Sequence, residues 1–213
     1  LGAKAEKFAY AINSTLKRPM AEGTISQESE AIVIMASIVQ ALIGKLDKDA
    51  ILYYSIPAEA INKSTNVKFH DKIAKMIFDN YKRSEAKINA FPINEARAIA
   101  VATEEPVAVC CSFGAGMINV CYAMYGWNPF QFSIVGAGDW VDVEAAKQFG
   151  YDPEHPDKKS QETPTSICHR KQQVDFTQAV NVANRLDQAI MLHYQILIEN
   201  VINGIIEGFN SNV

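Results

Sequence analysis

Apolar residues recur along the chain at spacings that switch between helical and strand-like periods. Helical spacing predicts helices over residues 2–13, 27–43, 67–81, 93–103 and 140–149. It also predicts either one long helix or two helices separated near the middle at about 178–209. Short apolar runs rich in β-branched and aromatic residues predict strands over 50–57, 87–91, 106–113, 117–125 and 129–135. Strands and helices that alternate and then lead into a hairpin are typical of an α/β fold with a mixed sheet flanked by helices.

Local signals mark the ends of some of these elements. Thr24 and Gln27 predict a capping box at the start of the 27–43 helix, and Gly44 predicts its end. Residues 150–175 are polar, contain several prolines and carry mixed charges, so we expect an exposed loop there.

The composition is that of an ordinary globular protein, and it excludes one class of function. Of the 213 residues, 48% are hydrophobic and 21% are charged, and the net charge is −4. The sequence has no long basic run and no basic stripe interleaved with aromatic residues. We therefore expect no nucleic-acid partner.

The sequence also predicts no membrane segment and no metal-binding cysteines. The most apolar run, residues 31–43, is shorter than the roughly 20 residues that a membrane span needs, and it is interrupted by Ser37 and Gln40. Cysteines stand at positions 110, 111, 121 and 168, without a Cys-x-x-Cys pair. We interpret them as buried free thiols in a reducing cytoplasm rather than as zinc ligands.

Two glycine turns are the best candidates for a binding site. The first, residues 112–116, joins two predicted strands, and the second, residues 136–139, joins a strand to a helix. Glycines let the backbone turn sharply and approach a ligand, which leaves amide hydrogens for an anion. A helix that begins after glycines is likewise an anion site. Together the two turns predict a phosphate held between two backbone loops.

Several segments resemble, in the same order, motifs of the actin-like ATPase superfamily, and within it those of the bacterial rod-shape protein MreB. Residues 112–120, SFGAGMINV, are similar to the second phosphate loop, Asp-x-Gly-Gly-Gly-Thr-Thr-x-Val. Residues 93–102, INEARAIAVA, are similar to the Glu-Glu-Pro or Asn-Glu-Pro helix of that superfamily. Further similar segments are LKRPMAEGTIS at 16–26, ILYYSIPA at 51–58 and GAGDWVD at 136–142.

The resemblance implies an actin-like, ribonuclease H-like fold that binds ATP and Mg²⁺ in a cleft between two domains. It places residues 1–26 at the end of a first subdomain, 27–110 in the rest of the first domain and 111–213 in a second domain. The chain resembles an internal portion of a longer protein. The nucleotide contacts implied by the resemblance are Ser112, Phe113, Gly114, Ala115, Gly116, Gly136, Ala137, Gly138 and Asp139.

Glu95 is the candidate catalytic residue. The resemblance implies that it orients the attacking water, or a metal-bound water, near the terminal phosphate. Without the resemblance, the favoured explanation of a glutamate that starts a helix is its interaction with the helix dipole. Asp139 is in the same way either a helix cap or a neighbour of the phosphates. We interpret four basic residues as solvated cations: Lys158, Lys159, Arg170 and Lys171. The resemblance implies instead that one of them contacts a base or phosphate of the nucleotide.

Two departures from the family pattern bear on the chemistry. The loop aspartate, which contacts the hydration shell of Mg²⁺ in the family, is replaced here by Ser112, whose hydroxyl can still hold a metal-bound water. The paired threonines of the loop are replaced by Met117 and Ile118. The glycines remain, so a phosphate site is retained while a metal-positioning carboxylate is lost.

By resemblance the leading hypothesis is an ATP-binding, MreB-like cytoplasmic protein that self-associates into filaments or dimers and hydrolyses ATP slowly. The alternative is a non-catalytic actin-like scaffold with a degenerate nucleotide cleft, which the changes at Ser112, Met117 and Ile118 favour. A small-molecule kinase of the same superfamily ranks last, because no acceptor pocket is evident in the sequence.

Overall fold

The computed structural model describes residues 8, 11–12, 17–44, 49–80, 88–148, 167–179 and 184–212. The chain divides into two compact units, residues 1–54 with 66–92 and residues 55–65 with 93–213. This division differs from the predicted boundary after residue 110, which falls inside a strand of the second unit. Most of the predicted helix at 2–13 and of the predicted loop at 150–175 lies outside the described residues.

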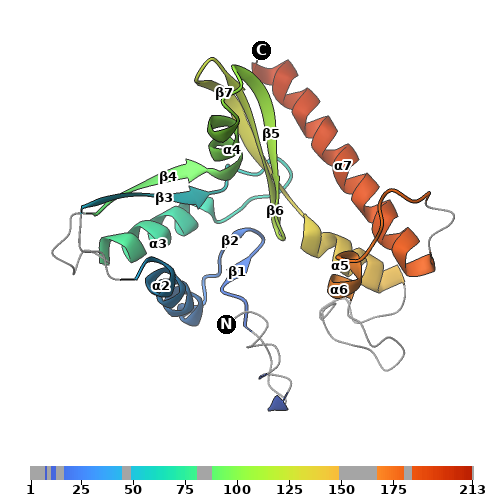
Figure 1. The fold of residues 1–213 in the computed structure, drawn as a ribbon, viewed down its shortest axis with the longest axis horizontal. Coiled ribbons are helices and arrows are strands. Elements are labelled where there is room, and N and C mark those ends of the chain that lie inside the picture. The colour runs from blue at the N-terminus through green and yellow to red at the C-terminus, as the bar shows by residue number, and fades with distance from the viewer. Residues whose placement is uncertain are drawn as a thin grey trace. The chain divides into compact units, whose positions relative to one another are not determined.

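The described part of the first unit contains small sheets together with helices (Figure 1). Its elements are β1 (Met20–Ala21), β2 (Thr24–Ile25), α2 (Ser29–Ile43), β3 (Ala50–Ile56), α3 (Val67–Asn80) and β4 (Ile88–Asn94). Strands β1 and β2 pair antiparallel, and β3 pairs with β4. The ends of β3 and β4 carry the chain into the second unit.

The start of α2 differs from the predicted capping box. Its N-cap is Glu28, which makes no side-chain capping bond. The Thr24 hydroxyl instead donates to the Ala21 carbonyl oxygen at 3.2 Å and closes the β1–β2 hairpin. The predicted end is confirmed, because Gly44 caps the helix with φ = 66°, a backbone conformation that favours glycine.

A buried histidine links the hairpin of the first unit to α3. The Ile25 amide donates to His70 Nδ1 at 3.1 Å, and both residues are buried. Ile25 packs with Ala31, Ile73 and Ile77 in the core of this unit. The bond to Nδ1 therefore joins β2 to α3 inside this core.

The second unit is a three-stranded antiparallel sheet between two helical layers (Figure 1). Its elements are α4 (Glu95–Thr103), β5 (Val107–Phe113), β6 (Met117–Met124), β7 (Trp127–Val135), α5 (Gly138–Gln148), α6 (Ile167–Lys171) and α7 (Arg185–Asn212). Strand β6 lies between β5 and β7. Residues 59–61 run parallel to β7 and bond to the backbone of Ser133.

Alternate residues of the strands serve the two faces of this sheet. Cys110 and Cys121, which are cross-strand partners, pack with Ala96 and Ala100 of α4. On the opposite face, the larger core joins β6 and β7 to α5 and α7 through Ile118, Val120, Phe130, Phe132, Ile134, Val141, Ile190, Leu197 and Val201. The period-two alternation along the strands therefore separates a small core under α4 from a large one under α5 and α7.

The turn between β6 and β7 is tighter than predicted. Tyr125 and Gly126 both have positive φ, 48° and 82°, as a two-residue type I′ turn requires. The right-handed twist of such a hairpin lets β7 begin at Trp127 rather than at the predicted residue 129. Pro129 lies within the strand, at a sheet edge, where its missing amide hydrogen is tolerated.

The final apolar stretch forms one continuous helix, α7. By length and composition alone, residues 185–211 of this helix would suffice to cross a membrane, with mean hydropathy 1.3. This differs from the sequence expectation, which found no apolar stretch of sufficient length. A stripe of α7 through Ile190, Leu197 and Val201 belongs to the core of the second unit, whereas Leu192, Ile198, Ile202 and Ile206 on the same helix are exposed.

Glycines let α7 approach β7 closely. A Cβ atom at Gly204 would lie 3.1 Å from the Phe132 ring and from the Ile61 side chain, and one at Gly208 would lie 3.0 Å from the Phe130 ring. We therefore expect Gly204→Leu to displace the helix and lower the free energy of unfolding by about 1–3 kcal/mol, the range for overpacked cores. Chemical denaturation of the full-length protein measures this change.

Asn203→Leu is the matched control, since Asn203 is the exposed neighbour of Gly204 on the same helix. It should leave the free energy of unfolding within about 0.5 kcal/mol of the original. Equal stabilities of the two variants would contradict the close packing of α7 on β7.

Candidate functional site

The two predicted glycine turns lie against each other at one end of the three-stranded sheet. The first turn supplies carbonyl oxygens and the second supplies amides, in the bonds Gly136 N to Gly116 O (3.1 Å), Gly138 N to Gly114 O (3.2 Å) and Asp139 N to Ala115 O (2.8 Å). Gly136 has φ = 94°, which favours glycine and turns the chain from β7 into α5. The sequence therefore correctly identified two turns that meet in space.

The bonds between the turns correct the predicted way of holding a phosphate. The amides of Gly136, Gly138 and Asp139 are used to join the turns, and the Gly114 amide donates to Met117 O at 2.9 Å. These amides are therefore already bonded within the protein. No backbone bond among the described residues uses the amides of Ala115 or Gly116, at the tip of the first turn.

A lysine from α6 reaches the start of α5 beside the joined turns. Lys171 Nζ donates to the Gly138 carbonyl oxygen and to Asp142 Oδ2, each at 2.8 Å. A Cβ atom at Gly138 would lie 3.3 Å from Lys171 Nζ, 3.4 Å from Gly114 O and 3.7 Å from the Ala115 Cα. The ammonium group, the first turn and the start of α5 therefore meet around Gly138.

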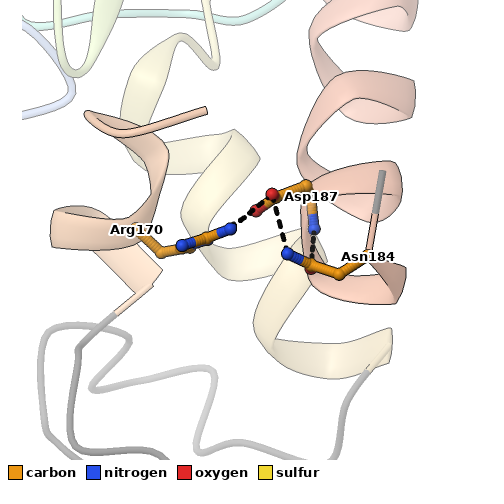
Figure 2. A network of polar contacts seen from close by, with 3 residues as sticks. All are labelled: Arg170, Asn184 and Asp187. Atoms are coloured by element: carbon orange, nitrogen blue, oxygen red, sulfur yellow. Dashed lines mark hydrogen bonds and ion pairs between the residues drawn. The ribbon is translucent and has the colours of Figure 1, made fainter. Parts of the chain in front are cut away.

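Lys171 was one of several cations that the sequence grouped as solvated, with one reaching a nucleotide. Its side chain is only 15% exposed, and its partner Asp142 is 4% exposed. Lys158 and Lys159, in the same group, lie outside the described residues. The remaining cation, Arg170, pairs with Asp187 at the start of α7, and Figure 2 shows this pair together with Asn184.

The face of the sheet that lies under α4 carries a row of polar residues. Asn119, on the central strand β6, lies opposite Ser112 of β5 and opposite Ser133 of β7. Residues directly opposite on antiparallel strands have neighbouring side chains on one face. Ser112, at the position of the family's loop aspartate, is therefore an immediate neighbour of Asn119.

Asn119 is the centre of a buried hydrogen-bond network. Its Oδ1 accepts from Ser133 Oγ at 2.7 Å, from the Ala58 amide at 3.3 Å and from Asn94 Nδ2 at 3.4 Å. Asn119, Ser133 and Asn94 are all buried. The network fastens residues 55–65 and the start of α4 to the sheet. These are the two places where the chain passes from the first unit into the second.

Glu95 belongs to the edge of the same network. Asn119 Nδ2 donates to Glu95 Oε2 at 3.5 Å, and Asn94, the residue before it, caps α4 by accepting from the Arg97 amide at 3.2 Å. Glu95 is otherwise exposed. The structure therefore brings Glu95 and Ser112, two of the predicted site residues, to the same asparagine.

Sequence reasoning missed Asn119 as a site residue. Its signal was a carboxamide within the apolar run 117–125, at a position that alternation assigns to a buried face. A buried amide needs hydrogen-bond partners from neighbouring elements, so its presence in a central strand predicts a polar network.

The remaining predicted site residues serve different parts of the fold. Met117 and Ile118, at the positions of the family's threonines, are buried in the sheet and form part of its cores. Ala137 is 1% exposed and packs in the large core, whereas Phe113 is 53% exposed at the end of β5. Asp139 lies in the first turn of α5, where a carboxylate favours the helix dipole.

The described residues contain no group of three or more His, Cys, Asp or Glu side chains arranged to hold a metal ion. Cys110 and Cys121 are buried as expected, and Cys111 and Cys168 are half-buried. Burial raises the pKa of the Cys121 thiol to about 11, with a further contribution from Cys110. Cys121 therefore stays protonated at neutral pH, as a packing residue.

Comparisons with known proteins identify the family and the fold. A family described as Volactin matches residues 1–212, so the chain belongs to the Volactin family. None of the curated proteins matches the sequence.

Solved structures add the fold. Ethanolamine utilization protein EutJ from Carboxydothermus hydrogenoformans is similar with a TM-score of 0.50 and 14% sequence identity, over 89% of this chain and 61% of EutJ. MreB5 of Spiroplasma citri bound to ADP has a TM-score of 0.48 and 19% identity, over 67% of this chain and 43% of that chain. The AMPPNP-bound form of MreB5 has a TM-score of 0.48 and 18% identity, over 67% and 44%.

The chain thus has the predicted mixed α/β, actin-like ATPase fold. It spans about three fifths of the length of EutJ and less than half of the MreB5 chain. At these identities the likeness shows the fold, and the activity has to be argued from the residues.

The central role of Asn119 can be tested by stability. Asn119→Leu keeps the approximate volume but removes the acceptor of Ser133, Asn94 and the Ala58 amide. Each of the three buried donors left without a partner costs about 1–3 kcal/mol, so we expect the free energy of unfolding to fall by about 3 kcal/mol or more. Denaturant unfolding of the full-length protein measures the change.

The control exchange is Asn210→Leu, at an exposed position near the end of α7. It should change the free energy of unfolding by less than about 0.5 kcal/mol. A similarly small change for Asn119→Leu would show that the network does not hold the two connecting segments to the sheet.

Proposed function

We propose that this Volactin-family chain belongs to an actin-like protein of the cytoplasm that binds ATP with Mg²⁺, hydrolyses it slowly and self-associates into filaments or dimers. The observation that carries the proposal is the corner around Gly138, where the joined glycine turns, the start of α5 and the Lys171 ammonium group meet. At that corner the amides of Ala115 and Gly116, which make no backbone bond to any described residue, lie near the ammonium group of Lys171, which is paired with Asp142, and such donors suit the phosphates of a nucleotide.

The phosphate contacts follow from the donors that remain. The amides of Ala115 and Gly116 lie at the tip of the first turn. Lys171 Nζ and the Ala115 Cα both lie within 4 Å of the point where a Cβ atom of residue 138 would be. The partial positive charge at the start of α5 adds to this attraction. The tip of the first turn and Lys171 would therefore bind the phosphates, while the second turn holds the first in place.

The hydrolytic role falls to Glu95, oriented by Asn119. A carboxylate that accepts a hydrogen bond from a buried carboxamide has a restricted orientation, and it can direct an attacking water as a general base or positioning group. Mg²⁺ usually keeps several waters and is bound by one or two carboxylates together with phosphates. Glu95 and the Ser112 hydroxyl would hold such waters, and the metal would neutralise phosphate charge.

The alternative of a non-catalytic actin-like scaffold is favoured by a different observation. Ser112 supplies no carboxylate, and Met117 and Ile118 are buried in the sheet cores. These three positions therefore serve packing or a neutral hydrogen bond rather than charge. A scaffold would keep the fold and its self-association and would hydrolyse little or no ATP.

Calorimetric titration of Mg-ATP into the full-length protein separates these functions. The proposal predicts saturable binding and slow release of phosphate, and sedimentation that increases when ATP is present. A scaffold would sediment equally with and without ATP. Absence of any binding would overturn the proposed nucleotide site.

Glu95→Ala tests the hydrolytic step. We expect phosphate release to fall by roughly 10²-fold, because the group that orients water is removed, while the Kd of Mg-ATP stays within about threefold. A steady-state phosphate-release assay and calorimetry measure the two quantities.

Glu105→Ala is the matched control, because Glu105 is exposed just beyond the same helix. It should change neither quantity. Unchanged turnover in Glu95→Ala would remove Glu95 from the mechanism, and a large loss of affinity would assign it to binding instead.

A further inference from the structure

We infer that Asp187 is a positioning residue for the nucleotide site, acting through Arg170 to hold Lys171 at the start of α5. The inference rests on the proposed nucleotide-binding function and names how that site is kept in shape. Asp187 lies at the start of α7, whereas the Lys171 ammonium group binds Gly138 and Asp142 of α5. Its influence would pass through the single short helix α6.

The Arg170–Asp187 pair has the geometry of a strong ion pair. Arg170 Nε donates to Asp187 Oδ1 at 2.6 Å, and Nη2 donates to Oδ2 at 2.5 Å. Both oxygens of the carboxylate are thus engaged by the planar guanidinium group, which adds directional specificity to the charge attraction. Hydrogen bonding to Asp187 raises the pKa of Arg170, so the guanidinium group stays charged.

Asp187 is itself held in place by the cap of α7. Asn184 Nδ2 donates to Asp187 Oδ2 at 2.8 Å, and the Asp187 amide donates to Asn184 Oδ1 at 3.0 Å (Figure 2). This reciprocal pair resembles a capping box, in which a residue at the helix start and one three positions later satisfy each other. The carboxylate therefore presents a fixed target to Arg170 from a 28-residue helix.

Helix α6 depends on such attachments because it has only five residues. Isolated helices of this length are unstable in water, so contacts with the rest of the unit must define its position. Its first residue, Ile167, is 2% exposed and packs in the large core. Its last two residues, Arg170 and Lys171, bind α7 and α5 respectively.

The two basic residues thus connect α6 to the start of α7 and to the start of α5. Neighbouring residues on a helix point about 100° apart, so Arg170 and Lys171 can reach different partners from one turn. The Arg170 pair fixes the rotation and position of that turn. Lys171 then has fewer conformations to lose when it binds the Gly138 carbonyl oxygen.

The test is a double-mutant cycle in the full-length protein, with the Kd of Mg-ATP as readout. Asp187→Asn removes the charge that holds Arg170, and we expect the Kd to rise roughly fivefold to tenfold, as for other directly coupled groups. In a Lys171→Ala background, the same Asp187→Asn exchange should leave the Kd unchanged within about twofold. If Asp187 acted on the fold in general and not through Lys171, Asp187→Asn would change the Kd by the same factor in both backgrounds.

Conservative and control variants sharpen the result. Arg170→Lys keeps the charge but loses the two-point geometry, so we expect a Kd between those of the original and of Arg170→Met. Glu144→Gln breaks an exposed ion pair with Lys147 on α5 and should leave the Kd unchanged.

The possible failures are distinguishable. If the original protein does not bind Mg-ATP, the proposed function fails and the inference falls with it. If it binds but Asp187→Asn has no effect, or the same effect without Lys171, only the positioning role of Asp187 is overturned. Circular dichroism and thermal unfolding of each variant confirm that the compared proteins are folded.

Discussion

The backbone hydrogen bonds between the two glycine turns determine the geometry of the second unit's candidate site. They hold residues 114–116, at the end of one hairpin, against residues 136–139, where β7 leads into α5. This contact decides where α5 begins, and the start of α5 in turn receives Lys171 from α6. Without the close approach at Gly138, the ammonium group and the first turn would not share one corner.

Two parts of the same sheet have different proposed roles. The end of the sheet near the glycine turns carries backbone donors and a cation, which suit phosphate binding. The face under α4 carries Asn119 with Ser112 and Glu95 beside it, which suits the orientation of water. Asn119 also fastens both segments by which the chain passes from the first unit into the second. A change in those connecting segments would therefore reach Glu95 through one side chain.

The sequence predicted most elements because their hydrophobic periods are strong, as in α3, α4 and the strands β5 and β6. It missed features that depend on distant partners. The type I′ turn at Tyr125 depends on a positive φ that its side chain does not indicate. Helix α6 is attached to the rest of the unit by Ile167, Arg170 and Lys171, whose partners are distant in the sequence. The same limit applies to the site. Adjacent glycine turns were predictable, but the bonding of their amides to each other was not.

Hydrogen exchange measured by mass spectrometry on the full-length protein, with and without Mg-ATP, tests the central claim most directly. The account predicts that amides of 136–139 exchange slowly even without nucleotide, because they bond to the first turn. It predicts that Mg-ATP adds protection in peptides covering 112–119 and 167–171. Protection confined to other peptides, or none on nucleotide addition, would contradict a phosphate site built on the joined glycine turns and Lys171.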